Sequence, residues 1–212
     1  MNLRVTEIFY SLQGETNQVG LPTVFVRLTG CPLRCQYCDT AYAFKGGELL
    51  SIENILLQVK QFNTSYVTVT GGEPLAQKSC LTLLTKLADA KFLVALETSG
   101  ALDISAVDSR IKKIVDIKTP DSKESARNHW QNLNFLSPQD EIKFVICSRS
   151  DYDWSKDILC QFNLINKCNV LFSPSYHELS AHQLAEWILA DRLPVRFQIQ
   201  LHKVLWGEKK GC

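Results

Sequence analysis

Three cysteines fall within eight residues, at Cys31, Cys35 and Cys38, in the order Cys-Pro-Leu-Arg-Cys-Gln-Tyr-Cys. Cysteine thiolates hold iron–sulfur clusters, and in electron-transfer proteins such a cluster usually has four protein ligands. A closed structural zinc site also takes four protein ligands. Three thiolates on one short loop leave one metal position open to another molecule, which is the arrangement of a catalytic metal centre.

The alternative for this loop is a zinc or iron–sulfur module that a distant cysteine or histidine completes. The loop itself contains no fourth ligand, and the chain's histidines lack the spacing of metal ligands. The other five cysteines are scattered along the chain, at Cys80, Cys147, Cys160, Cys168 and Cys212. We interpret the first four of them as small buried residues.

A second motif, Gly71-Gly72-Glu73-Pro74, has residues suited to a small charged ligand. Two glycines let the backbone approach a ligand closely, and the Glu73 carboxylate can accept hydrogen bonds from an ammonium group. Taken alone, the motif is better explained as a turn in which proline begins a helix. The functional interpretation therefore depends on the fold placing it beside the cysteines.

Alternating strands and helices must position these motifs. Apolar, β-branched runs predict strands at 23–29, 66–70, 92–97, 113–117, 141–146, 169–172 and 196–201. Helical patterns lie at 52–62, with Ser51 as N-cap, and at about 79–88. A third helix runs to about Leu189 from a capping box at Ser180–Gln183, with Leu179 and Leu184 as a hydrophobic staple. The predicted class is α/β with a parallel sheet, because parallel neighbours need crossover connections.

An open doubly wound sheet and a full or partial barrel both fit this alternation, and in both of them ligands bind at the carboxyl ends of the strands. The cysteine loop follows strand 23–29, and the Gly71–Pro74 motif follows strand 66–70. Glu97-Thr-Ser-Gly100 ends the next strand. We therefore expect three unusual sequences on one rim. The least regular stretch, 119–139, is interpreted as a surface excursion or lid.

Composition excludes several classes of protein. The 212 residues are 45% hydrophobic and carry a formal net charge of +1, which fits one domain over residues 1–212. Nucleic-acid binding would need a basic patch, and no long run of lysine and arginine is present. The N-terminus lacks an apolar signal stretch, and no segment reaches the roughly 18 apolar residues of a membrane span. We expect a cytoplasmic protein, with reduced thiols and with no nucleic-acid or membrane partner.

The two motifs together resemble those of the radical S-adenosylmethionine superfamily, which usually has an aromatic residue, here Tyr37, before its third cysteine. The resemblance implies a 4Fe–4S cluster on the three cysteines and S-adenosylmethionine on the open iron. One electron would then cleave the sulfonium and yield a 5′-deoxyadenosyl radical. The glycines and Glu73 would hold the methionine amino group.

A closer resemblance, from about residue 5 to the C-terminus, is to the 7-carboxy-7-deazaguanine synthases. The matching motifs are Ser11-Leu-Gln-Gly-Glu15, Arg27, Cys38-Asp-Thr40, Glu97-Thr-Ser-Gly100 and Gln200-Leu-His-Lys203. The resemblance implies radical ring contraction of 6-carboxy-5,6,7,8-tetrahydropterin to 7-carboxy-7-deazaguanine, with release of ammonia, for queuosine and other deazapurines. It also implies that S-adenosylmethionine is regenerated and that Mg2+ is required. With this resemblance we expect an α/β partial barrel, an incomplete TIM-like barrel with a parallel sheet.

The same resemblance assigns roles by position. Cys31, Cys35 and Cys38 would hold the cluster, and Thr40 would offer Mg2+ a hard oxygen ligand. S-adenosylmethionine would lie against Tyr37, Cys38, Asp39, Gly72, Glu73, Gly100, Lys118 and Ser173. The substrate would lie against Leu12, Gln13, Gly14, Glu15, Arg27 and Thr98. In this scheme Glu15 accepts from pterin N–H groups, and Arg27 pairs with the substrate carboxylate.

Parts of the chain leave alternatives open. Asp116-Ile-Lys-Thr119 replaces a Ser-Pro-Lys pattern of the family, and Arg27 could instead be a strand residue facing solvent. In relatives the C-terminal end approaches the substrate, which makes Cys212 and its carboxylate of interest. The expected partners are the pterin substrate, an electron donor such as flavodoxin or ferredoxin, and a second copy in a homodimer. Two other functions fit the cysteine loop: an activase that installs a glycyl radical on a partner, and a non-catalytic metal module.

Overall fold

The computed structural model describes residues 1–211, and Cys212 lies outside the described part. Nine strands and five α-helices make up its framework. The strands are β1 (Asn2–Leu12), β2 (Pro22–Leu28), β3 (Glu48–Ser51), β4 (Tyr66–Gly71), β5 (Leu93–Thr98), β6 (Lys112–Ile117), β7 (Glu141–Ile146), β8 (Asn169–Pro174) and β9 (Arg196–Phe197). The helices are α1 (Ile52–Lys60), α2 (Cys80–Asp89), α3 (Arg149–Phe162), α4 (Ala181–Ala190) and α5 (Leu201–Trp206).

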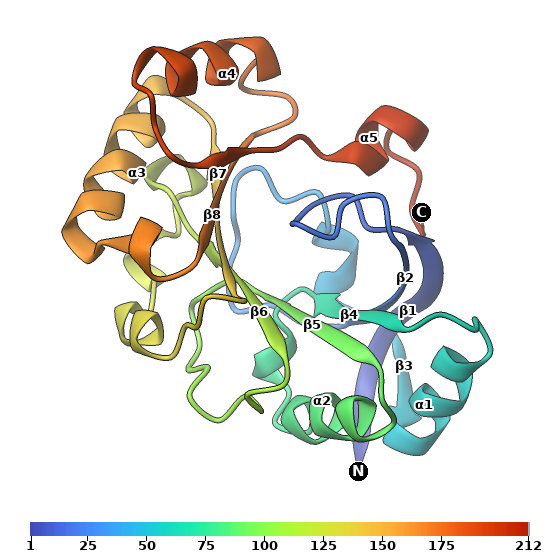
Figure 1. The fold of residues 1–212 in the computed structure, drawn as a ribbon. Helices are drawn as coiled ribbons and strands as arrows, with labels where there is room; N and C mark the ends of the chain where they lie inside the picture. Colours follow the sequence, from blue (N-terminus) through green and yellow to red (C-terminus); the bar gives the residue numbers. More distant parts are fainter. Residues whose placement is uncertain (212) are drawn as a thin grey trace.

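All nine strands belong to one sheet, in the order β3-β1-β2-β4-β5-β6-β7-β8-β9. β1 runs antiparallel to both of its neighbours, and every pair of neighbours from β2 to β9 is parallel. The sheet is curved but open, because its edge strands β3 and β9 do not pair with each other (Figure 1). The predicted α/β fold, a partial barrel of alternating strands and helices, is confirmed.

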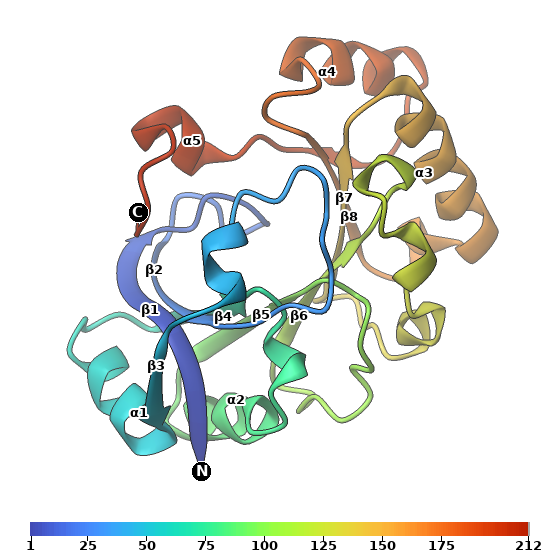
Figure 2. The ribbon, with the colours of Figure 1, turned by 180° about the vertical axis from the view of Figure 1, so that it is seen from behind.

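Helices α1 to α4 lie on the outer side of the curved sheet, and the loops after β1 and β2 lie on its inner side (Figures 1 and 2). Short α5 follows β9 and crosses the open end of the concave side near those loops (Figure 1). The concave side is therefore the place where strand ends, two loops and the C-terminal helix converge. No helix of residues 1–211 is long and apolar enough to cross a membrane.

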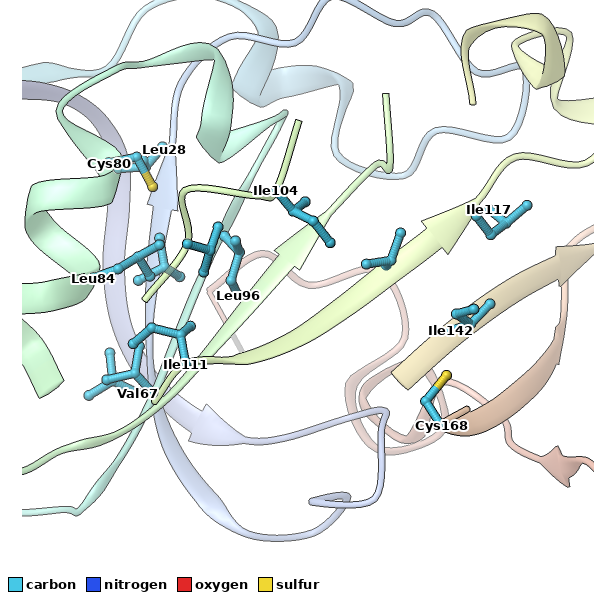
Figure 3. Close-up of a cluster of buried hydrophobic side chains, with 14 of the residues drawn as sticks. Leu28, Val67, Cys80, Leu84, Leu96, Ile104, Ile111, Ile117, Ile142 and Cys168 are labelled. Atoms are coloured by element: carbon cyan, nitrogen blue, oxygen red, sulfur yellow. The ribbon is translucent and has the colours of Figure 1, made fainter. Parts of the chain in front are cut away.

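The hydrophobic core fills the space between the sheet and the outer helices. Figure 3 shows Cys80 of α2 beside Leu28 of β2, with Leu84 of the same helix one turn further along. These three side chains are fully buried, and burial of each such leucine contributes roughly 1.5–3 kcal/mol. The expected buried role is confirmed for Cys80, Cys147 and Cys168, whereas Cys160 is exposed. The prediction for Cys160 was therefore wrong.

Helix starts follow the sequence signals in part. The Ser51 hydroxyl caps α1 by accepting a hydrogen bond from the Asn54 backbone N–H at 3.1 Å. Ser180 occupies the N-cap position of α4, but its side chain makes no capping hydrogen bond, so the predicted capping box is not formed. Leu179 and Leu184, the predicted staple, are both buried in the core.

Four elements differ from the sequence prediction. β1 and β3, which pair with each other, were not predicted, because β1 mixes polar and apolar residues and β3 has only four residues. Helix α3 was also missed, since its buried face includes Asp151 and Ser155 and so lacks an unbroken apolar stripe. The predicted strand 196–201 ends at Phe197, because the Leu201 N–H bonds to the Gly14 carbonyl and α5 begins there.

Candidate active site

A cavity of about 590 Å3 opens on the concave side of the sheet. Its wall is built from the carboxyl-end residues of the parallel strands, the two loops after β1 and β2, and α5. Every residue that the sequence assigned to the site lines this cavity except Glu73 and Gly100: Leu12, Gln13, Gly14, Glu15, Arg27, Cys31, Cys35, Tyr37, Cys38, Asp39, Thr40, Gly72, Thr98, Lys118 and Ser173. The fold therefore brings together residues that lie up to 161 positions apart, as in the pair Asp39–Gln200.

The cysteine loop is anchored at its start by the end of β4. The Gly30 carbonyl accepts a hydrogen bond from the Glu73 N–H at 2.7 Å, and the Gly30 N–H donates to the Ala43 carbonyl at 2.8 Å. A Cβ on Gly72 would come within 2.3 Å of the Gly30 oxygen and 2.8 Å of the Cys31 Cβ. Only glycine allows this approach, so the two predicted motifs meet directly, backbone against backbone.

The three cysteine side chains of the loop are half-buried and face the cavity. Burial raises the pKa of each thiol, and it raises that of Cys35 to about 11, so a metal must displace the proton of each thiol. In residues 1–211 no three His, Cys, Asp or Glu side chains converge on one metal ion. Three thiols of one loop that face one cavity are the kind of donor set that holds an iron–sulfur cluster.

Lys118, Asp116 and Tyr37 form the wall next to the cysteines. The Lys118 ammonium lies 3.0 Å from Asp116 Oδ2 and 5.8 Å from the centre of the Tyr37 ring. Burial alone would lower the pKa of Lys118, but the Asp116 charge raises it well above its ordinary value. Asn128 holds the Lys118 backbone with two hydrogen bonds of 2.9 Å. Lys118 therefore stays a fixed cation beside the cluster loop.

Glu73, to which the resemblance gives a role toward the methionine amino group, lies behind the cavity wall. Its side chain is fully buried and does not line the cavity. The carboxylate accepts hydrogen bonds from the Thr98 hydroxyl at 2.9 Å, from the Ser99 N–H at 2.6 Å and from the Leu75 N–H at 3.0 Å. In this arrangement Glu73 fixes the end of β5, and the residues of its motif that border the cavity are Gly71 and Gly72.

Gly100 also lies behind the cavity wall. Its φ of +73° is in the left-handed region that favours glycine, and its carbonyl accepts from the His129 N–H and the Asn132 side chain. The Asn132 amide also donates to the Leu102 carbonyl at 2.8 Å. The stretch 119–139, expected as an excursion or lid, is therefore a set of short turns tied to the strand ends.

Gln13 enters the concave side from the loop after β1. Its amide donates to Glu97 Oε1 and to the Thr68 hydroxyl, both at 3.3 Å. The backbone of Gln13 is fixed by exchange of hydrogen bonds with Leu21 and Gly20 across the loop. The loop thus carries a buried amide into the part of the cavity away from the cysteines.

Glu15, two residues further on, is paired with a lysine that no sequence motif indicated. Lys143 Nζ lies 2.7 Å from Glu15 Oε2 and 3.7 Å from Asp116 Oδ2. Burial would lower the pKa of Lys143, but Glu15 and Asp116 raise it above its ordinary value, so Lys143 remains charged. Its signal in the sequence was a single cation inside the apolar run Glu141-Ile-Lys-Phe-Val-Ile146.

Arg27 lines the cavity and is not a solvent-facing strand residue. Its Nε donates to Glu7 Oε1 at 2.7 Å, and its guanidinium lies 5.7 Å from the Phe9 ring centre and 5.9 Å from that of Tyr42. Among residues 1–211, the hydrogen bonds of this guanidinium use Nε alone. The two terminal nitrogens therefore retain donors for an anionic group of a ligand.

Thr40 and Asp39 also line the cavity. The Thr40 hydroxyl donates to Asp39 Oδ1 at 2.7 Å, and the Gln200 amide donates to Asp39 Oδ2 at 3.3 Å. Burial raises the pKa of Asp39, but the Thr40 hydrogen bond and the Lys203 charge outweigh it and hold the pKa below its ordinary value. This pair offers hard oxygen atoms to a ligand.

Helix α5 and residues next to it contribute to the lining of the cavity. The Leu201 N–H donates to the Gly14 carbonyl at 2.9 Å, and a Cβ on Gly14 would come within 2.2 Å of the His202 ring. Further along, His177 Nε2 and Glu208 Oε1 are 2.9 Å apart. Gln200, His202, Lys203 and Glu208 all line the cavity, so the tail motif is part of the site.

Comparison with known proteins agrees with this geometry. Residues 25–162 match the model of the radical SAM superfamily. The chain is 43% identical to a 7-carboxy-7-deazaguanine synthase of Chlorobaculum tepidum, over 97% of this chain and 94% of the relative. It is 40% identical to a 7-carboxy-7-deazaguanine synthase of Koribacter versatilis, over 99% of this chain and 100% of the relative.

The fold is also found in a solved structure. The crystal structure of QueE from Escherichia coli superposes with a TM-score of 0.79 at 23% identity, covering 94% of each chain. At that identity the likeness concerns the fold, and the sequence relatives carry the family assignment. The chain belongs to the radical SAM superfamily and, within it, to the 7-carboxy-7-deazaguanine synthase family.

Proposed function

We propose that this chain is a 7-carboxy-7-deazaguanine synthase. It contracts the ring of 6-carboxy-5,6,7,8-tetrahydropterin to give 7-carboxy-7-deazaguanine and ammonia, as a step toward queuosine or another deazapurine. The observation that carries the proposal is the cavity itself, in which the three-cysteine loop and a set of buried polar side chains face the same space. Relatives with this name match the chain over nearly its full length.

The cluster end of the cavity is formed by Cys31, Cys35 and Cys38, which would hold the 4Fe–4S cluster. When bound, the cluster and S-adenosylmethionine supply a 5′-deoxyadenosyl radical. Tyr37, whose hydroxyl is buried without a hydrogen-bond partner among residues 1–211, and Lys118 would border that cofactor. The remaining cofactor contacts would come from Asp39, Gly72 and Ser173, which line the cavity, and Gly100 and Glu73 would support them from behind its wall.

The substrate end lies under the loop after β1. Gln13 and Glu15 would read the pterin N–H and carbonyl groups, and Arg27 would bind the substrate carboxylate through its terminal nitrogens. Leu12, Gly14 and Thr98 border the same space. Burial of these groups would strengthen each hydrogen bond to the substrate and keep water from the reacting ring.

A magnesium ion would be held at Thr40. Mg2+ usually keeps several waters and takes few protein ligands, so one hydroxyl together with the substrate carboxylate is a sufficient set. The short distance from the Thr40 hydroxyl to Asp39 supports this proposal, because Asp39 can accept a hydrogen bond from a metal-bound water. Titration of substrate binding to the protein, with and without Mg2+, would test this proposal.

Three further expectations stay proposals: an electron donor of the flavodoxin or ferredoxin type, a homodimer, and a cytoplasmic location. The homodimer is supported by large apolar side chains exposed near β1 and β5, among them Tyr10, Leu21 and Leu93. Light scattering after size-exclusion chromatography would test it. The cavity favours a small polar substrate over the glycyl-radical activase alternative, because its inner wall carries charged and amide groups.

The experiment that tests the function is turnover of the reconstituted protein without oxygen. Purified protein with iron and sulfide restored is mixed with reductant, S-adenosylmethionine, Mg2+ and 6-carboxy-5,6,7,8-tetrahydropterin. We expect 7-carboxy-7-deazaguanine by mass spectrometry, and no product when S-adenosylmethionine is left out. A reduced cluster that cleaves S-adenosylmethionine but forms no deazaguanine would favour another radical enzyme.

A further inference from the structure

Glu97 is a cavity-lining carboxyl to which neither the sequence motifs nor the family resemblance gave a role. It lies near the end of β5, and the side chains of Gln13, Thr70 and Lys143 surround it. Its hydrogen bonds come from the Gln13 amide and the Thr70 hydroxyl, which are neutral donors. Within residues 1–211 no lysine, arginine or histidine nitrogen comes within ion-pair distance of this carboxyl.

The cations nearest to this β5 carboxyl already have carboxylate partners. Lys143 lies 2.7 Å from Glu15 and 3.7 Å from Asp116. Arg27 lies 2.7 Å from Glu7. A half-buried carboxyl that is surrounded by paired charges gains little from ionising, because its own charge would be left without a partner.

The influences of the surrounding groups on the pKa of Glu97 agree with this geometry. Burial is the largest influence and raises the pKa of Glu97 above its ordinary value. Lys143, the Thr70 hydroxyl and Arg27 lower the pKa by less, and the Glu15 charge raises it further. A carboxylic acid whose pKa is raised by its surroundings is suited to proton transfer, as in other enzymes with raised carboxyl pKa values.

We propose that Glu97 is the acid that protonates the departing nitrogen when ammonia is released. The inference rests on the proposed function, in which substrate and product differ only by the elements of ammonia. The carbon–nitrogen bond breaks, and its electron pair stays on the nitrogen, which takes the Glu97 proton. The neighbouring carbon loses a proton to water as its electron pair forms the ring double bond, and water returns a proton to Glu97. No oxidant or reductant is consumed in this step.

The first test uses Glu97→Gln, which preserves the shape of the side chain but cannot donate an acidic proton. With substrate deuterated at C6, we expect the variant to transfer deuterium to S-adenosylmethionine at close to the wild-type rate. Release of ammonia should fall about 100-fold, which is the low end of the contribution of a general acid. Glu97→Asp should recover part of that loss, because a carboxylic acid is restored.

The second test reads protonation in the cluster-free protein by infrared difference spectroscopy between pH 5 and pH 8. Wild-type protein should show a buried protonated-carboxyl band that Glu97→Gln lacks. Glu141→Gln, at a fully buried glutamate paired with Lys112, should keep the band, as should Glu186→Gln on the surface of α4. Absence of the band from wild type, or wild-type ammonia release by Glu97→Gln, would overturn the inference. The proposed function itself fails only if wild-type enzyme makes no deazaguanine.

Discussion

At the scale of single residues, charge in the cavity is arranged around two lysines. Lys143 is shared by Glu15 and Asp116, and Lys118 contacts Asp116 from the other side. Removal of one partner from a buried ion pair leaves the other charge uncompensated. The stability lost in this way exceeds the net stability that the intact pair contributes. The substrate end of the site therefore depends on a lysine that touches no predicted motif except Glu15.

Lys143→Met tests this dependence. The change leaves Glu15 without its cation, so the free energy of unfolding should fall by about 3 kcal/mol. The KM for the pterin should rise by at least tenfold, because Glu15 loses its fixed orientation. Urea denaturation and steady-state kinetics measure the two effects. Lys86→Met is the matched control: its pair with Glu53 is exposed and 3.8 Å long, so less than about 1 kcal/mol should be lost. Equal losses in both variants would contradict the account.

Cys35→Ser tests the cluster ligands. Serine keeps the size of the side chain but removes one of three thiolates, so iron content and the brown colour should be lost. Cys160→Ser, at an exposed cysteine on α3, should retain the full iron content of wild type. Iron analysis and absorption spectra after anaerobic reconstitution report the outcome. A complete 4Fe–4S complement in Cys35→Ser would show that the ligand assignment is wrong.

The raised pKa of Glu97 predicts a pH dependence of stability. The folded pKa lies above the unfolded value of 4.5, so the folded protein binds this proton more tightly. The contribution is complete below pH 4.5 and is lost as pH rises through the folded pKa; a tenfold tighter proton corresponds to about 1.4 kcal/mol. Denaturation of cluster-free wild type and Glu97→Gln across pH 4 to 8 should show this fall in wild type alone. Parallel curves would contradict it.

Part of the site could be predicted from local sequence motifs. Cys31 and Gly72 belong to short patterns whose places after predicted strands already predict a shared rim, and Gln13 belongs to a motif of the family resemblance. The structure places all three around one cavity. Lys143 could not be predicted, because which face of β7 it occupies depends on strand phase and on a partner 128 residues away. The buried contacts of Glu73 with Thr98 and Ser99 could not be predicted either, because these partners lie 25 and 26 residues away.

At the scale of elements, the close contact between the end of β4 and the cysteine loop is the joint that aligns the two motifs. Gly72→Ala places a Cβ within 2.3 Å of the Gly30 oxygen, which is backbone and cannot move aside. We expect a loss of roughly 2–4 kcal/mol in unfolding free energy and poor cluster assembly, measured by denaturation and iron content.

Gly20→Ala is the control for that prediction. Gly20 has a φ of +85°, and a Cβ added there would meet no atom within 4 Å, so alanine should cost only about 1–2 kcal/mol of backbone strain. Cluster assembly should be unchanged in this variant. Gly72→Ala with wild-type iron content would show that the two backbones can separate, against the role given to this joint.

Elements with continuous apolar patterns were predicted well, and those defined by tertiary contacts were not. β4 and β7 are buried runs of β-branched and apolar residues, and both lie where the sequence placed them. α5 has no buried residue, and its position is set by the Leu201–Gly14 hydrogen bond and the His202 contact with Gly14. No periodicity in residues 198–206 encodes that docking.

At the scale of the whole molecule, the open sheet explains why one cavity can have room for both the cluster loop and the substrate wall. A closed eight-stranded barrel fills its interior with side chains. Here the sheet stops at β3 and β9, and the loop after β1, the cysteine loop and α5 occupy the concave side, leaving about 590 Å3 between them. The cluster loop and the polar substrate wall can thus face each other across a single space.

Turnover is the most direct test of this architecture, because the wild-type protein must convert the pterin in the same cavity that holds the cluster. The decisive measurement is the ratio of ammonia to 7-carboxy-7-deazaguanine formed anaerobically with reductant, S-adenosylmethionine and Mg2+. We predict equal amounts of the two products, many turnovers for each S-adenosylmethionine lost, and none with Cys35→Ser. Uncoupled cleavage of S-adenosylmethionine, with neither ammonia nor deazaguanine, would contradict the assignment.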